Sequence, residues 1–213
     1  DYQFAKIKEL MGEYESWGSD LRTGAKSAVN IGSLEMAQVP PVEGNERNWT
    51  NWPEYLDSLA SNHRKKAYFS VEGSYDRFDT IRASLVAFRE EKRAIAVGAL
   101  WRNEWTYAAG GIIPKIYGDS GFGHAFKICG YKNVAGEPYL IAQLSNGTNI
   151  GDRGYFYFPR EVVNREFVYG CFMFADLPDG VDKETAKKKS VRYRSLSWSF
   201  IELLKAYLSD IFR

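Results

Sequence analysis

Two histidines and two cysteines are the residues of this sequence most suited to nucleophilic chemistry. A thiol hydrolase needs a cysteine within reach of a histidine that accepts its proton, and a further group that orients the histidine. Cys129 follows His124 by five residues on one expected strand, and an odd offset places two side chains on opposite faces. We therefore expect Cys129 to be a core thiol rather than a nucleophile. Cys171, which lies next to Phe and Met residues, is expected in the core as well, whereas His63 lies in a polar stretch and is expected at the surface.

Composition and spacing exclude several other kinds of function. The few Cys and His residues are not clustered as zinc ligands are, so no metal is expected. The sequence also has no glycine-rich phosphate loop, so no cofactor is expected. With 28 basic and 27 acidic residues the net charge is +1, which predicts no nucleic-acid partner. No apolar run approaches the roughly 20 residues of a membrane span. Two cysteines and two Asn-x-Thr sequons are compatible with a secreted or extracellular assembly but do not determine the compartment.

His124 begins a stretch that the sequence divides into three short strands separated by turns. The first two strands alternate large and small side chains, and the third is rich in aromatic residues. Asn and Gly cluster between them, as is typical of turns. The strands are expected at residues 124–131, 139–144 and 154–158.

The amino-terminal part predicts a mainly helical region. The first helix should span residues 1–14, and a second should begin after Asp20 as its N-cap and end near Gly32. An irregular connection is expected over residues 38–60. The apolar face expected for the first helix consists of Phe4, Ile7, Leu10, Met11 and Tyr14.

Strands and helices alternate in the rest of the chain. Trp49, Trp52, Trp101 and Trp105 are expected to serve core and lobe-interface packing rather than to form a ligand box. Strands are expected at residues 66–71, 94–101 and 167–174, a helix at residues 74–92 and one helical turn at residues 161–163.

The segments around His124 resemble two segments of the papain-like cysteine peptidases. GHAFKICGY is similar to the strand that carries the family's catalytic histidine, and LSNGTNIGDRGYFYF is similar to its Asn-Ser-Trp-Gly segment. The resemblance places His124 at the catalytic histidine and Leu144 at the asparagine that orients it. Asn146 falls where the family has a tryptophan.

The carboxy-terminal segment, residues 177–213, resembles the beginning of the same family. LPDGVD is similar to the mature amino terminus, and SWSF is similar to the Ser-Cys-Trp-Ala-Phe at the head of the central helix. An amphipathic helix follows, as a central helix requires. The resemblance implies that Ser197 occupies the nucleophile position and Arg194 the position of the glutamine that binds the oxyanion.

The resemblance covers the chain in permuted order. Residues 1–176 resemble the papain-like domain from after its central helix to its end, and residues 177–213 resemble the part that precedes them. Two origins are compatible with this order. The domain is circularly permuted, or it is one period of a tandem array in which helix 196–213 enters a neighbouring subunit, a domain swap.

Either origin implies an α+β fold with the two lobes of papain. The helical lobe would combine residues 196–213 with residues 1–60, and residues 61–176 would form an antiparallel, β-barrel-like lobe.

Three of the four catalytic positions differ from the family's residues. Leu144 cannot exchange a hydrogen bond with an imidazole, Ser197 replaces the thiol, and Arg194 brings a charge. The sequence therefore predicts an inactive homologue with a structural or binding role, such as a repeating unit of an assembly. Its expected partners are copies of itself, through exchange of helix 196–213, and a peptide or protein segment in the cleft between the lobes.

The alternative is an active hydrolase. Residue 197 would be the nucleophile, as a natural serine or in place of a native cysteine, and His124 would be the base. Such an enzyme would need another polar partner for His124. Gln143 or Asn146 could supply it after a register shift in the turn.

Overall fold

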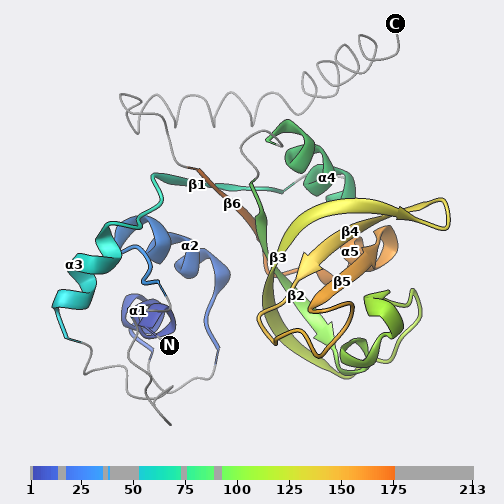
Figure 1. The fold of residues 1–213 in the computed structure, drawn as a ribbon, viewed down its shortest axis with the longest axis horizontal. Coiled ribbons are helices and arrows are strands. Elements are labelled where there is room, and N and C mark those ends of the chain that lie inside the picture. The colour runs from blue at the N-terminus through green and yellow to red at the C-terminus, as the bar shows by residue number, and fades with distance from the viewer. Residues whose placement is uncertain are drawn as a thin grey trace, which may run out of the picture. The chain divides into compact units, whose positions relative to one another are not determined.

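The computed structural model describes residues 2–13, 18–35, 38, 53–72, 76–88 and 93–175 of the chain. The predicted helix 196–213, with Ser197 and Arg194, lies outside these ranges, as do Trp49 and Trp52. Short helices precede a mainly β region (Figure 1).

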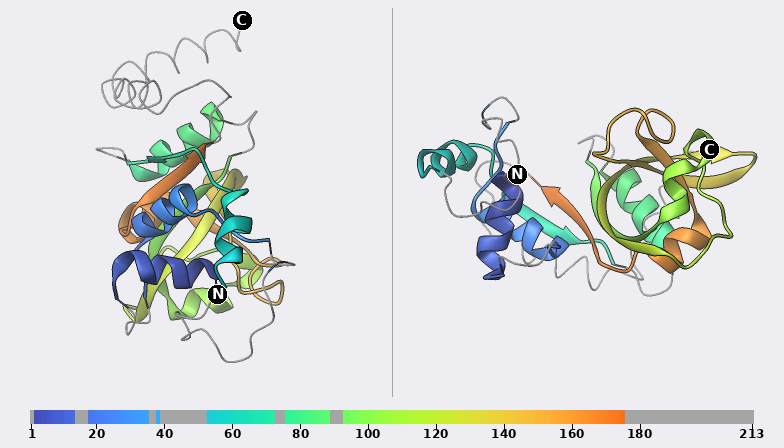
Figure 2. Two further views of the ribbon diagram at one scale, coloured as in Figure 1. Left: turned by 90° about the vertical axis from the view of Figure 1, so that its left-hand side faces the viewer. Right: turned by 90° about the horizontal axis from the view of Figure 1, so that it is seen from below.

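Three helices lie together in the amino-terminal part (Figure 2). They are α1 (Tyr2–Met11), α2 (Leu21–Asn30) and α3 (Tyr55–Ser61). The predicted N-cap of α2 is confirmed, since Asp20 Oδ1 accepts a 2.8 Å hydrogen bond from the backbone N of Thr23.

Two details of this region differ from the sequence-based expectation. Helix α3 lies where an irregular connection was expected, and its Leu56 and Ala60 are buried against Tyr2. The buried face of α1 consists of Tyr2, Ala5 and Lys8. Of the expected apolar set, Leu10 is exposed and Tyr14 lies outside the described residues. The face that a short helix buries depends on its neighbours, and α3 was the neighbour that the sequence did not reveal.

The β region is one antiparallel sheet of six strands in the order β1-β6-β2-β3-β4-β5. Figure 1 shows the long strand β3 bending around the core. The predicted α+β fold is confirmed, and each predicted strand has a counterpart. The bounds are β1 (Ala67–Ser70), β2 (Ile95–Arg102), β3 (Gly121–Val134), β4 (Glu137–Gln143), β5 (Tyr155–Pro159) and β6 (Cys171–Ala175).

The hairpin between β3 and β4 follows directly from its turn residues. Val134 pairs with Glu137, which leaves the two-residue loop Ala135–Gly136. Both loop residues have positive φ, 50° and 85°, as a type I′ turn requires. The turn predicted between the first two of the three short strands is therefore confirmed, and it sets the register of the strand that carries His124.

Alternation along β3 separates a core face from an outer face. Phe126 and Ile128 are buried, and His124 shares their face by its even spacing. Cys129 is exposed, so the expectation of a core thiol was wrong. The odd offset does place Cys129 on the face opposite His124, but that face of β3 is open to solvent there. The register with β4 also shifts between Ile128 and Gly130, which leaves Cys129 unpaired in that ladder.

Two further helices lie against the sheet. Helix α4 (Arg77–Ala87) contacts β3, and α5 (Arg160–Glu166) contacts β2, β4 and β5. The core between them is strongly aromatic, with rings at 5–6 Å centroid separations. It includes Trp101 and Trp105, as expected, and also Phe126, Phe156, Phe158 and Phe167. Phe167 caps α5 and does not begin the last strand.

Candidate functional site

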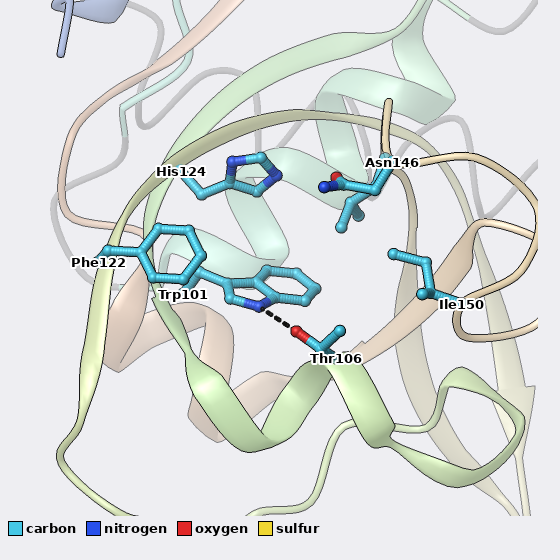
Figure 3. A pocket seen from close by; sticks show the side chains of 7 residues that line it. Trp101, Thr106, Phe122, His124, Asn146 and Ile150 are labelled. Carbon is cyan, nitrogen blue, oxygen red and sulfur yellow. Dashed lines mark hydrogen bonds between the residues drawn. The ribbon is translucent and has the colours of Figure 1, made fainter. Parts of the chain in front are cut away.

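A small open pocket of about 50 Å³ lies at the start of β3, beside His124. Strand β2 contributes Trp101, the short helix η2 (Asn103–Tyr107) contributes Thr106, and the connection from β4 to β5 supplies three side chains. Figure 3 shows these groups converging on one space. The pocket is lined by Trp101, Thr106, Phe122, His124, Leu144, Asn146 and Ile150.

Aromatic side chains surround the imidazole ring of His124. Cross-strand pairing places Ala99 opposite His124 and Trp101 opposite Phe122. The ring centroid of His124 lies 5.6 Å from that of Trp101, 6.1 Å from Phe122 and 6.0 Å from Phe126. Trp101 is itself fixed, because its Nε1 donates a 3.2 Å hydrogen bond to Thr106 Oγ1. These aromatic contacts restrict the position of the imidazole ring without forming hydrogen bonds to its nitrogen atoms.

The connection after β4 places an apolar and a polar side chain at the pocket. Leu144 is 8% exposed and its backbone N donates a 3.1 Å hydrogen bond to the carbonyl of Gly154, which continues the pairing beyond β4. Asn146, two residues on, lines the same pocket, and Figure 3 shows its amide end directed toward His124. The pairing between β4 and β5 continues through Leu144 in one register. Asn146 therefore lines the pocket without the register shift that was considered for an active enzyme.

The surroundings of His124 favour its neutral form. Burial lowers the pKa of the imidazole, and the polar interaction with the Asn146 side chain opposes this in part. Among the described residues that line the pocket, His124 is the only titratable group. A neutral imidazole has one donor and one acceptor nitrogen, so it can take up a proton or bind a polar group in the pocket.

The structure brings together two of the four predicted catalytic positions, His124 and Leu144. Ser197 and Arg194 lie outside the described residues, and the roles assigned to all four positions stay predictions. Cys171 is fully buried and its pKa is raised to about 12 by burial, as expected of a core thiol. His63 is exposed, as expected.

The sequence did not identify the pocket residues contributed by other elements. Thr106 and Phe122 lie outside the quoted motifs, and Ile150 lies within LSNGTNIGDRGYFYF but was given no role. Trp101 was expected to serve core and lobe-interface packing. Phe122 had one usable signal, since it lies two residues before His124 and shares its face of the strand. Thr106 reaches the pocket through tertiary contacts, for which the sequence contains no local signal.

The described residues contain no cluster of three or more His, Cys, Asp or Glu side chains that could hold a metal ion. Within the same ranges, no helix has the length and apolar character needed to cross a lipid bilayer.

Several solved structures have a similar fold, among them proteases and a procathepsin. Xylellain, a cysteine protease from Xylella fastidiosa, is 17% identical with a TM-score of 0.64, over 83% of this chain and 69% of that one. Digestive procathepsin L 3 of Tenebrio molitor is 16% identical with a TM-score of 0.62, over 82% and 54%. The bromelain protease of Ananas comosus is 16% identical with a TM-score of 0.53, over 82% and 76%. At these identities the likeness concerns the fold, and this chain spans about half the length of the Tenebrio procathepsin.

Sequence comparisons agree with the fold. No curated protein sequence matches the chain significantly. The sequence profile described as papain family cysteine protease matches residues 48–170, more than half of the chain and the part that builds the pocket. The chain therefore belongs to the papain family of cysteine proteases.

Proposed function

We propose that this chain is a papain-family domain that binds a peptide segment at the His124 pocket without cleaving it. The pocket is small and open, and Trp101, Phe122 and Ile150 offer apolar surfaces against which an apolar peptide side chain can pack at its mouth. His124 and Asn146 offer hydrogen-bonding groups for the peptide backbone. Phe122 is 52% exposed, so a partner can reach it.

The observation that carries the non-cleaving role is the position of the chain's cysteines. The sequence contains two, Cys129 and Cys171, and neither lines the pocket. Cys171 is buried in the core and Cys129 lies on the outer face of β3. A papain-type mechanism requires a thiolate paired with the histidine, and this chain has no thiol at that place.

The residues predicted at the remaining catalytic positions also favour a role without cleavage. Ser197 would supply an alcohol, which is far less acidic than a thiol, and Arg194 would replace a neutral hydrogen-bond donor. Leu144 would leave the histidine without the family's orienting asparagine. Each substitution weakens hydrolysis and leaves peptide binding possible.

A peptide-binding experiment tests this proposal. Short peptides that each carry one large apolar side chain would be titrated into the full chain while the His124 ring resonances are followed by NMR. We expect saturable shifts, and mass spectrometry should find the peptides intact. Phe122→Ala should weaken binding about tenfold, because one aromatic contact of roughly 1.4 kcal/mol is lost.

Tyr131→Ala is the matched control. Tyr131 lies on the same strand, is 48% exposed and does not line the pocket. Its substitution should leave the affinity unchanged. Equal losses in both variants, or no shift of His124 with any peptide, would refute binding at this pocket.

Hydrolysis is the second candidate, and the position of Asn146 favours it. The amide directed toward His124 is a polar partner of the kind that an active enzyme would need. In this case Ser197 would be the nucleophile and His124 the base. Peptide fragments that disappear in both Ser197→Ala and His124→Ala would establish hydrolysis and overturn the non-cleaving role.

A further inference from the structure

Asn146 lies where a side chain can control the orientation of His124. The connection after β4 presents Leu144 and then Asn146 to the pocket, and the amide of Asn146 is directed toward the imidazole in Figure 3. Leu144 contributes a buried apolar contact and cannot exchange a hydrogen bond with the ring. Within the pocket, the polar side chain directed toward His124 therefore belongs to the neighbour two residues on.

Among the side chains that line the pocket, Asn146 is best suited to orient the imidazole. Trp101 and Phe122 make ring contacts with His124, and the Trp101 Nε1 donor is already engaged by Thr106. An amide carries both a donor and an acceptor, so it can pair with one particular nitrogen of a neutral imidazole. A pairing of this kind selects one tautomer and one ring orientation.

We propose that Asn146 is the positioning residue of His124, in place of the family position occupied here by Leu144. Aromatic contacts limit the tilt of the ring, and the Asn146 amide determines which ring nitrogen faces the open pocket. The inference deepens the proposed function, since its value for peptide capture rests on binding at this pocket. The orientation of His124 itself is a property of the free protein.

The interaction has a second consequence that does not depend on activity. The Asn146 side chain supports the protonated imidazole and thereby raises the pKa of His124 against the effect of burial. Loss of the amide should lower this pKa further. A carboxylate at the same place should raise it.

The test is NMR of the imidazole nitrogens in the peptide-free full chain, with variants at position 146. In the parent chain we expect His124 to show one neutral tautomer. Asn146→Ala should produce a mixture of tautomers and a lower pKa, Asn146→Asp a higher pKa, and Asn146→Gln partial recovery of the single tautomer. His63 is the other histidine and provides an internal reference at an exposed site.

Asn149→Ala is the matched control, because Asn149 is exposed in the same connection and does not line the pocket. It should leave the tautomer and the pKa of His124 unchanged. Unchanged His124 signals in Asn146→Ala, or the same changes in Asn149→Ala, would overturn the inference. Asn146 is exposed, so its substitution should not unfold the protein, and unchanged dispersion of the backbone amide resonances would verify this.

Peptide titration separates this inference from the proposed function. If Asn146→Ala produces a mixture of His124 tautomers while the parent chain binds no peptide, Asn146 is the positioning residue and the proposed function fails. If peptides bind the parent chain and the ring is unaffected by Asn146→Ala, the function stands and the inference fails.

Discussion

At the residue scale, the state of His124 follows from a balance between burial and one polar neighbour. Aromatic rings exclude water from part of the imidazole, which lowers its pKa, and Asn146 opposes this shift. The balance favours a neutral ring near pH 7, with one nitrogen free to accept a proton or a hydrogen bond. The same burial makes the stability of the fold sensitive to acid.

We predict that His124 makes the free energy of unfolding decrease below about pH 6.5. Its folded-state pKa lies below the ordinary value of 6.5, so the unfolded chain takes up the proton first as the pH falls. Stability should therefore be lost between pH 6.5 and the folded-state pKa, with no contribution from His124 above pH 6.5. Urea unfolding from pH 7.5 to 5 should show a smaller decrease in His124→Gln.

His63→Gln is the control for this measurement, because it removes the other histidine, which is exposed. Comparing the two variants separates the loss of the pocket histidine from the loss of a histidine elsewhere in the chain. Identical slopes in His124→Gln and the parent chain would show that burial does not perturb His124.

At the element scale, a buried ion pair fixes the loop that leads into β3. Glu166, the last residue of α5, is 3% exposed, and its Oε2 lies 2.8 Å from Arg102 Nη2 at the end of β2. Its Oε1 accepts a 2.8 Å hydrogen bond from the hydroxyl of Tyr117, whose pKa burial and the carboxylate raise to about 12. Arg102 also donates to the carbonyl of Asp119. The carboxylate thus joins α5, β2 and the loop that precedes Phe122 and His124.

We predict that Glu166→Ala lowers the free energy of unfolding by about 3 kcal/mol. The substitution leaves the guanidinium of Arg102 largely buried without its charged partner, and breaking a buried pair costs in that range. Urea unfolding at pH 7 measures the loss. The His124 resonances should also broaden or shift, since the loop before β3 loses its anchor.

Glu161→Ala tests whether burial of the carboxylate causes the loss of stability expected for Glu166→Ala. Glu161 lies on the same helix and pairs with Lys115 at 3.3 Å, but its side chain is 58% exposed. Its removal should cost less than about 0.5 kcal/mol. Similar unfolding midpoints for the two variants would show that burial does not increase the contribution of the Glu166–Arg102 pair to the free energy of unfolding.

At the scale of the whole molecule, the described part supplies the six-stranded antiparallel sheet and the pocket beside His124. The assignment of residues 177–213 to the central helix and the permuted order stay predictions. They carry a consequence for assembly, because an amphipathic helix that completes a neighbouring unit would link copies of the chain.

We predict that the full chain self-associates as its concentration rises. Sedimentation velocity over a wide concentration range should show larger species, and replacing Leu204 and Leu208 by Asp should abolish them. Both residues belong to the predicted apolar face of helix 196–213. Glu202→Lys changes a charge on the expected polar side of the same helix without removing apolar surface and should leave association intact. A monomer at every concentration would contradict helix exchange.

The amino-acid sequence by itself determined the features that depend on neighbouring residues. Alternation predicted the strands, Asp20 predicted the start of α2, and Asn- and Gly-rich segments predicted the turns, because these preferences act within a few residues. The resemblance to papain-like peptidases, rather than any local preference, predicted that His124 and Leu144 reach one site, and both line the pocket. The family resemblance was likewise inferred from short motifs and is confirmed.

Only the tertiary structure decided which face of each element meets solvent and which side chains meet one another. Cys129 lies outward because nothing covers that face of β3 in the described part of the chain, and α1 buries Tyr2 because α3 packs beside it. Asn146 lines the His124 pocket because the pairing with β5 carries the chain past Leu144 in register. Each outcome depends on contacts between segments distant in sequence, which local preferences do not specify.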